Sequence, residues 1–157
     1  MKTIVICGAT ATGKSDLAVS LAQEIDGEII NADSMQIYKG MDIGTAKLTE
    51  SERAGIAHHL LDVLQVTDDA TVAWYQGLAR AAVAEIHNRG KHAIIVGGTG
   101  LYIKSILDDL NFPDTDAAVR QKLTEEAKEF GIVQLFQRLE LLDPAAAAAI
   151  DRQNERR

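Results

Sequence analysis

Residues 8–15 read Gly-Ala-Thr-Ala-Thr-Gly-Lys-Ser, which matches the pattern G-x-x-x-x-G-K-S. A short apolar run rich in β-branched residues, Thr3–Cys7, precedes this stretch, and apolar residues at helical spacing follow it. Strand, glycine-rich turn and helix in that order are the context in which the pattern forms a phosphate-binding loop. The alternative, a chance match on an ordinary strand-to-helix turn, is disfavoured by this context. The stretch therefore predicts an α/β fold with an anion site at the start of its first helix.

The residue types in this loop suit the binding of a phosphate group. Gly8 and Gly13 allow backbone angles that a β-carbon would disfavour, so successive N–H groups can point inward at a helix N-terminus. Lys14 adds a positive charge for a terminal phosphate, and the hydroxyl of Ser15 is a candidate Mg²⁺ ligand. The candidate phosphate-binding residues are Gly8, Ala9, Thr10, Ala11, Thr12, Gly13, Lys14 and Ser15. The loop alone does not distinguish a nucleotide from another pyrophosphate compound.

Overall composition argues against several other classes of protein. The net charge of −7 disfavours a protein that holds nucleic acid by general electrostatics, although it allows a locally basic groove. Cys7 is the single cysteine, so no internal disulfide can form, and its place in an apolar run predicts a small buried side chain. The adjacent His58 and His59 do not suggest zinc, because neighbours on a strand point to opposite faces. No apolar run approaches the ~18 residues of a membrane span, so we expect one cytoplasmic domain over residues 1–157.

The remaining pattern alternates between strands and helices. The expected strands are 3–7, 28–32, 60–64 and 93–96, and the expected helices are 13–24, 68–88, 101–107 and three more after residue 113. Residues 48–57 are polar and predict a short helix or a loop, capped by Thr49 with Glu52. The alternation predicts a parallel sheet with helices on both faces, like that of P-loop NTPases, with its first strand in the centre. The phosphate site would then lie at the carboxyl edge of the sheet.

Apolar residues at three- and four-residue spacing define one buried face on each of the longer helices. In helix 68–88 this stripe comprises Val72, Tyr75, Leu78, Ala79, Ala82, Val83 and Ile86. After residue 113 the stripes comprise Val119, Leu123 and Ala127, then Leu135, Leu139 and Leu142. Thr71 and Asp143 are the expected N-caps of helix 68–88 and of the last helix.

Polar residues follow the expected strands at the edge where a ligand would bind. Asp33 comes directly after the second strand, where a carboxylate can serve Mg²⁺ or act as a general base; a turn or helix-cap aspartate is an equally good interpretation. The run 97–100, Gly-Gly-Thr-Gly, offers backbone N–H groups and the Thr99 hydroxyl to a second part of the substrate, unless it is only a tight turn. Residues 35–47 combine apolar, aromatic and basic side chains with glycines, which indicates a ligand-contacting loop or a packed irregular connection.

Three stretches together resemble one family. They are 8–15, 33–47 (Asp-Ser-Met-Gln-Ile-Tyr-Lys-Gly-Met-Asp-Ile-Gly-Thr-Ala-Lys) and 96–102 (Val-Gly-Gly-Thr-Gly-Leu-Tyr). The run His-Leu-Leu-Asp at 59–62 and the final Asn-Glu-Arg-Arg at 154–157 add to them. On these residues the chain is similar to the tRNA dimethylallyltransferases, also called tRNA isopentenyltransferases, along its whole length. The stretch 33–47 is the most specific of these motifs.

The resemblance implies an activity and a set of site residues. Enzymes of this family transfer a dimethylallyl group from dimethylallyl pyrophosphate to N6 of the adenosine immediately 3′ of the tRNA anticodon, with Mg²⁺. The loop would hold the prenyl pyrophosphate rather than ATP, with Ser15 on the metal, while Asp33 would accept a proton or hydrogen bond from the adenine amine. The implied catalytic residues are Asp33, Thr99 and Lys14. The implied tRNA-binding residues are Asp33, Ser34, Met35, Gln36, Thr99 and Arg120.

Basic side chains are candidates for contacts with RNA phosphates. They are Lys39, Lys47, Arg120, Arg156 and Arg157. Because the chain is acidic overall, we expect most of the RNA-binding surface to belong to the part of the family that this chain does not contain.

The chain also departs from the family pattern. Family members are roughly twice as long, which implies that residues 1–157 correspond to the P-loop half, without the inserted tRNA-binding domain and the C-terminal part. Arg152 stands where proline is usual. Full-length members are expected to be monomers, whereas this half could self-associate through exposed apolar surface. Three other functions stay open: an adenylate isopentenyltransferase that makes cytokinins, a small P-loop kinase that binds ATP, and an inactive phosphate-binding fragment.

Overall fold

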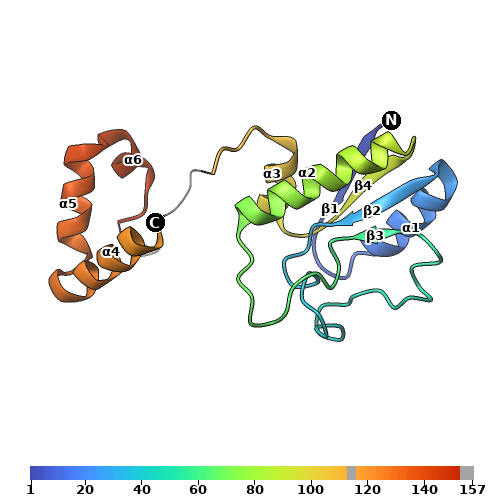
Figure 1. Ribbon diagram of the computed structural model, residues 1–157, viewed down its shortest axis with the longest axis horizontal. Helices are drawn as coiled ribbons and strands as arrows, with labels where there is room; N and C mark the ends of the chain where they lie inside the picture. Colours follow the sequence, from blue (N-terminus) through green and yellow to red (C-terminus); the bar gives the residue numbers. More distant parts are fainter. Residues whose placement is uncertain (113–115, 153–157) are drawn as a thin grey trace. The chain divides into compact units, whose positions relative to one another are not determined.

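The protein is described by a computed structural model that covers residues 1–112 and 116–152 (Figure 1). The chain divides into two compact units, Met1–Asn111 and Phe112–Arg157. The first unit holds the sheet and the candidate site, and the second unit holds three helices. Within the described ranges, no helix combines the length and the apolar character needed to cross a membrane.

A four-stranded parallel sheet forms the centre of the first unit, in the order β1 (Thr3–Cys7), β4 (His92–Gly97), β2 (Gly27–Asn31), β3 (His58–His59). β4 is the strand that pairs with both β1 and β2 over five residues each, and it is buried along almost its whole length. The prediction that the first strand is central is therefore wrong, because β1 pairs only with β4 among the described residues. Cys7, expected to be buried, is exposed at the end of this edge strand.

Helices cover both faces of the sheet, as predicted (Figure 1). α1 (Lys14–Ile25) packs against one face, while α2 (Val72–Asn88) and α3 (Gly100–Leu107) pack against the other. Ile94 faces α1 and its neighbour Ile95 faces α2, because successive residues of a strand point to opposite sides. Both faces of the central strands are therefore apolar, which a parallel sheet covered by helices requires.

The predicted cap and stripe of α2 hold with one exception. The Thr71 hydroxyl accepts the N–H of Trp74 at 3.1 Å, and Gly90 follows the helix with a φ of +81°. The buried residues of α2 are Tyr75, Ala79, Ala82 and Ile86. Leu78, expected on the same stripe, is 41% exposed because it lies at the margin of the face that these four residues define.

The strand predicted at 60–64 is wrong, because β3 ends before it. Leu60 (φ +60°) and Asp62 (φ +55°) both have left-handed backbone, which a strand does not contain. The carbonyl of Leu60 accepts an N–H of the Asn31 side chain at 3.0 Å, and the Asp62 carboxylate accepts the Lys47 ammonium at 2.6 Å. These two polar contacts direct the chain out of the sheet immediately after β3.

Residues 48–57 form turns, in line with the loop alternative. The expected capping contacts are nevertheless present: the N–H and the hydroxyl of Thr49 donate to the Glu52 carboxylate at 2.8 and 2.7 Å. Ala54 (φ +50°) and Gly55 (φ +76°) have left-handed backbone, so the helix that the cap would begin cannot continue.

The second unit consists of α4 (Ala117–Phe130), α5 (Ile132–Leu142) and α6 (Pro144–Ala149). Asp143 caps α6 as predicted, since its carboxylate accepts the N–H of Ala146 at 2.9 Å. Neither α4 nor α5 contains a fully buried residue. The predicted stripe positions Leu123, Ala127, Leu135 and Leu139 are half-buried. Arg156 and Arg157 lie outside the described residues.

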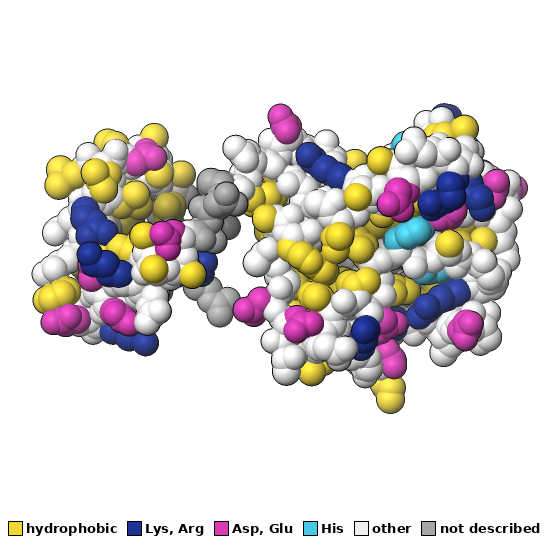
Figure 2. All heavy atoms as spheres, viewed as in Figure 1, with side chains coloured by type: hydrophobic (Ala, Val, Ile, Leu, Met, Phe, Trp, Pro, Cys, Tyr) yellow, Lys and Arg dark blue, Asp and Glu magenta, His cyan; other side chains and the backbone are white. Residues whose placement is uncertain are grey.

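Apolar side chains reach the surface of this second unit, as the yellow atoms in Figure 2 show. Val119 and Leu142, both expected on buried stripes, are 53% and 76% exposed. The other large exposed apolar side chains of this unit are Phe130, Val133 and Leu141. The physical reason is that three short helices bury too little surface to enclose both stripes.

Candidate functional site

The loop between β1 and α1 has the backbone of an anion site. Gly13, the last residue before α1, has a φ of +76°, which an L-residue rarely adopts, and Ala11 shares this left-handed conformation at +61°. No side chain caps the N-terminus of α1. The first N–H groups of this helix are therefore directed at the loop rather than bonded to a cap, and a phosphate group is the kind of ligand that such groups bind.

Lys14 places its ammonium group over this loop. Its Nζ donates to the carbonyl of Ala9 and lies 3.5 Å from the hydroxyl of Thr12, which itself donates to Ala9 at 2.9 Å. The positive charge thus sits above the backbone N–H groups, where both would act on one anion.

The loop opens into a cleft of about 340 Å³ at the carboxyl edge of the sheet. Five segments line it: the phosphate loop with the start of α1, the end of β2, the 35–47 loop, the 48–57 turns and the end of β4. The lining residues are Thr10–Asp16, Asn31, Asp33, Gln36, Thr45–Leu48, Glu52 and Val96–Gly98. The structure therefore brings two of the three motifs in the sequence, and the start of the third, to one cavity.

Asp33 is half-buried in this cleft, and the side chain of Asn31 fixes its backbone. Asn31 Oδ1 accepts the N–H of Asp33 and Nδ2 donates to the carbonyl of Asp33, both at 3.0 Å. The Asp33 carboxylate accepts the N–H of Met35 at 2.8 Å. Asp33 therefore makes the contact expected of a turn aspartate. It also lines the cleft, which a Mg²⁺ ligand or a general base would have to do.

A buried tyrosine supports this turn from beneath. The hydroxyl of Tyr75 donates to the backbone carbonyl of Asn31 at 2.8 Å, and its ring stacks on Tyr102 with centroids 3.8 Å apart. Burial raises the pKa of Tyr75 far above its ordinary range, which keeps the hydroxyl protonated and able to donate. Neither Asn31 nor Tyr75 was singled out as part of the site by the sequence; the only signal for Asn31 is a polar residue at the end of an apolar strand.

Thr99 joins the two strand ends rather than lining the cleft. Its hydroxyl accepts the N–H of Ser34 at 3.0 Å and donates to the Ser34 hydroxyl at 3.3 Å. The N–H of Thr99 donates to the carbonyl of Ala32 at 3.1 Å. Among the sequence-derived RNA-binding residues, Ser34 is thus half-buried beside Thr99, while Met35 is 46% exposed. Arg120 is exposed on α4 in the second unit.

Lys47 is a correction to the sequence interpretation. It was a candidate for RNA phosphates, but its side chain is only 2% exposed and its ammonium already donates to Tyr38, Asp42 and Asp62. Burial alone would lower the pKa of Lys47, but the hydrogen bonds that its ammonium donates to Asp42 and Asp62 outweigh this effect and raise it. Lys47 is therefore a buried residue of the cleft wall that is charged at physiological pH. Lys39, by contrast, is exposed.

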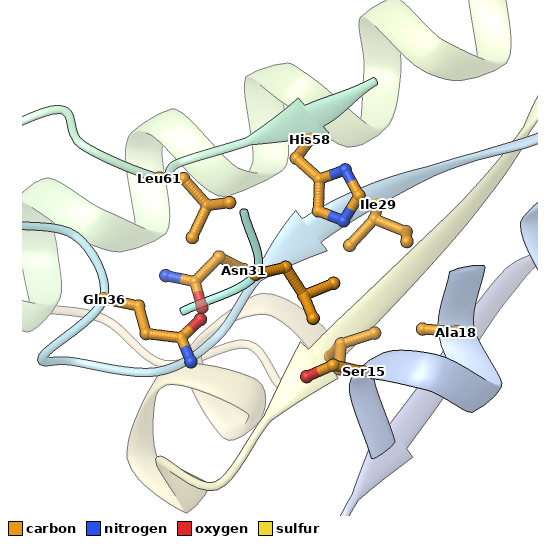
Figure 3. A pocket seen from close by; sticks show the side chains of 9 residues that line it. Ser15, Ala18, Ile29, Asn31, Gln36, His58 and Leu61 are labelled. Atoms are coloured by element: carbon orange, nitrogen blue, oxygen red, sulfur yellow. The ribbon is translucent and has the colours of Figure 1, made fainter. Parts of the chain in front are cut away.

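A small hollow of about 20 Å³ adjoins the cleft, and Figure 3 shows the side chains that line it. Asn31 and Gln36 lie close together on one side, and Ile29, Ala18 and Ser15 lie on the other. This volume has room for about one water-sized group, so the hollow is an extension of the cleft and not a separate ligand site.

The two adjacent histidines serve different parts of the fold. His58 borders the hollow, and its Nδ1 lies 2.8 Å from the carbonyl of Ile56. Burial lowers the pKa of His58, so the ring is neutral at physiological pH. His59 Nε2 instead lies 2.7 Å from the carboxylate of Glu28. The pair therefore does not converge on a common ligand.

The donor groups of the cleft suit a metal ion held mainly by a substrate. Within the described residues, no group of three or more His, Cys, Asp or Glu side chains could hold a metal ion. Ser15 and Asp33 do line the same cleft, and they offer a hydroxyl and a carboxylate oxygen. Mg²⁺ commonly takes one or two protein oxygens and completes its shell with substrate phosphates and water, so these residues fit that ion.

Comparisons with known proteins match almost the whole chain. A family model described as IPP transferase matches residues 36–157. The chain is 55% identical over 144 residues to a tRNA dimethylallyltransferase of Pseudarthrobacter chlorophenolicus. The aligned stretch covers 92% of this chain and 48% of that protein. It is also 55% identical over 156 residues to a tRNA dimethylallyltransferase of Acidothermus cellulolyticus. That aligned stretch covers 99% of this chain and 49% of that protein. The chain thus spans about half the length of these curated relatives.

Solved structures show the same likeness. A full-length tRNA isopentenylpyrophosphate transferase from Bacillus halodurans matches with a TM-score of 0.70 and 43% identity, over 99% of this chain and 52% of that chain. A eukaryotic dimethylallyltransferase acting on tRNA matches with a TM-score of 0.86 and 31% identity, over 99% of this chain and 39% of that chain. The fold of this chain is therefore the P-loop-like fold of these proteins.

Proposed function

The chain belongs to the IPP transferase family, and on that premise we propose that it is the phosphate-binding half of an enzyme that transfers a dimethylallyl group to tRNA. The donor is dimethylallyl pyrophosphate, and the acceptor is N6 of the adenosine 3′ of the anticodon. The observation that carries the proposal is that the phosphate loop and Asp33 line one cleft. A leaving pyrophosphate and an attacking amine can therefore both be held there.

The proposed reaction needs both the phosphate loop and Asp33. The exocyclic amine of adenine is a weak nucleophile, so its attack on the allylic carbon depends on close placement and on a base. The new N–C bond forms as the C–O bond to pyrophosphate breaks, and the proton of the amine passes to the Asp33 carboxylate. Charge develops on the leaving pyrophosphate, where Lys14 and the N–H groups of the loop stabilise it.

Mg²⁺ is the proposed cofactor, and Ser15 is its proposed protein ligand, because the Ser15 hydroxyl lines the cleft at the start of α1. When bound, the ion would neutralise charge on the pyrophosphate. The protein's own part is to hold the pyrophosphate by the loop residues Gly8–Ser15 and to keep Asp33, the proposed base, in the same cleft.

The RNA side of the proposal rests on the residues that follow Asp33 in the chain and on exposed basic side chains. A base within a stem-loop must be splayed out before it can enter a pocket. We propose that Ser34, Met35 and Gln36 contact the target base region and that Thr99 holds their backbone through its bond to Ser34. Exposed Lys39 and Arg120 are proposed for contacts with RNA phosphates.

The alternatives are less well supported. The relatives named above act on tRNA according to their names, whereas an adenylate isopentenyltransferase or a small kinase would use a free nucleotide. The phosphate-binding fragment without transfer activity keeps one observation in its favour, which is that the chain spans about half the length of its relatives.

A transfer assay separates these possibilities. The chain is incubated with labelled dimethylallyl pyrophosphate, Mg²⁺ and an anticodon stem-loop RNA, and label in the RNA is measured for wild type, Asp33→Asn and Asp69→Asn. We expect transfer by wild type, a rate lower by about 10²–10⁴-fold in Asp33→Asn, and no change in Asp69→Asn, an exposed carboxylate. Binding of the donor without transfer would support the inactive fragment, and equal rates in wild type and Asp33→Asn would contradict the role of Asp33.

A further inference from the structure

The 35–47 loop forms one wall of the cleft, but it has almost no apolar core to hold its shape. Ile37 is fully buried, whereas Ile43 is 99% exposed. Ala46 has a left-handed φ of +51°, a conformation that persists only where surrounding contacts enforce it. Polar contacts must therefore fix the far half of this loop.

Lys47 supplies the charged contacts among them. Its Nζ donates to the carbonyl of Tyr38 at 2.8 Å, to Asp42 Oδ1 at 2.8 Å and to Asp62 Oδ1 at 2.6 Å. An ammonium group has three N–H donors, so these three acceptors use all of them. The lysine thereby joins the start of the loop, its tip and the segment after β3.

We propose that Lys47 is a positioning residue that holds the 35–47 loop in the shape that walls the substrate cleft. The inference rests on the proposed function in one respect, that this cleft takes the substrate. Thr45, Ala46 and Leu48 lie on either side of Lys47 in the chain and line the cleft, so release of the ammonium would move the wall itself.

The near half of the loop has separate supports, which makes the role of Lys47 specific. The N–H of Lys39 donates to Leu64 at 2.9 Å, and the N–H of Val63 donates to Ile37 at 2.8 Å. The side chain of Gln36 also ties the far half to the near half, because it donates to the carbonyl of Thr45 at 2.9 Å in a neutral hydrogen bond. The charge-assisted bonds of Lys47 are the stronger class, so their loss should loosen the loop without unfolding the sheet.

Hydrogen exchange measured by mass spectrometry tests this role. Wild type is compared with Lys47→Met, and Lys39→Met is the matched control because Lys39 is an exposed lysine of the same loop. We expect amides of residues 40–47 to exchange at least about tenfold faster in Lys47→Met, since charge-assisted hydrogen bonds are lost. Amides of α2 and β4 should keep their rates, and Lys39→Met should match wild type. Unchanged exchange in residues 40–47 of Lys47→Met would overturn the proposal.

A second variant and a binding readout keep the test decisive. Asp42→Asn removes one charged acceptor at a 61% exposed side chain, so it should leave the fold intact and raise exchange in the same amides by a smaller factor. Affinity for magnesium pyrophosphate should stay within about twofold in both variants, because the phosphate loop is a separate segment. Joint loss of pyrophosphate binding and of protection in α2 and β4 would show general support of the fold, and would overturn the proposal. If wild type itself fails to bind pyrophosphate, the proposed function fails, while the exchange comparison still decides the role of Lys47.

Discussion

The absence of a β-carbon at Gly97 allows the ends of β2 and β4 to approach each other closely. A Cβ built on Gly97 would lie 2.2 Å from the carbonyl carbon and oxygen of Ala32, which is far inside van der Waals contact. Ala32 is fully buried, and its N–H donates to the carbonyl of Val96 at 2.7 Å. The close approach is what places Thr99 within reach of Ser34, so glycine at this position shapes the site.

Gly97→Ala should therefore destabilise the fold by about 3 kcal/mol or more, because neither backbone segment can move without breaking sheet hydrogen bonds. Urea unfolding followed by circular dichroism measures the change. Gly77→Ala is the matched control: this glycine lies on α2 with open space around its Cβ position, and alanine there should stabilise by up to about 1 kcal/mol. Equal stabilities of wild type and Gly97→Ala would contradict the close packing of the two strand ends.

At the residue scale, the sequence pointed to candidate site residues but not to the residues that hold the loops around them in place. Residues 8–15 and Asp33 could be proposed because their types and spacing carry a chemical meaning. The roles of Asn31 and Lys47 depend on contacts with residues far away in the chain, such as Leu60 and Asp62. Such contacts leave no local pattern, so these roles could not be predicted.

At the level of elements, one buried carboxylate joins two strands and a helix end. Glu28 on β2 lies 2.7 Å from His59 on β3 and 2.7 Å from Arg89 at the end of α2. Burial alone would raise the pKa of Glu28, but the hydrogen bonds from Arg89 and His59 outweigh this effect and lower it. The folded state therefore favours the ionised carboxylate.

This coupling predicts how stability depends on pH. The stabilisation from Glu28 is present above the ordinary pKa of 4.5 and is lost as the pH falls below it through the lowered value of the folded state. Glu28→Gln removes this contribution, so its difference from wild type in free energy of unfolding should shrink as the pH falls below 4.5. Chemical denaturation over a pH series measures it, with Glu24→Gln, an exposed glutamate on α1, as the control for loss of one charge. A difference that stays the same at neutral and at acidic pH would contradict the ion-pair account.

Helices were predicted from the sequence more accurately than strands. The bounds of α1, α2 and α3 differ from the predicted helices by only a few residues, because their periodicity and caps are local signals. The strand at 60–64 failed because distant polar contacts at Leu60 and Asp62 override local propensity. The prediction that the first strand is central failed for a related reason. β1 and β4 are both apolar, so their local sequences do not show which of the two pairs with a neighbour on each side.

At the scale of the molecule, the chain carries the part of the family fold that contains the proposed phosphate loop. All the segments that line the cleft belong to the unit Met1–Asn111. The net charge of −7 gives this chain little general attraction for RNA, which agrees with the proposal that its own cleft binds the prenyl donor. We therefore propose that the loop at residues 8–15 selects a prenyl pyrophosphate over a nucleotide.

Calorimetric titration with dimethylallyl pyrophosphate and, separately, with ATP tests this preference of the loop. Both ligands are added with Mg²⁺ to wild type, to Lys14→Ala and to Lys122→Ala, in which an exposed lysine of α4 serves as the control. We predict that wild type and Lys122→Ala prefer the prenyl pyrophosphate and that Lys14→Ala loses this binding by at least about tenfold, since one charge-assisted contact disappears. Preference for ATP in wild type, or unchanged affinity in Lys14→Ala, would contradict the account.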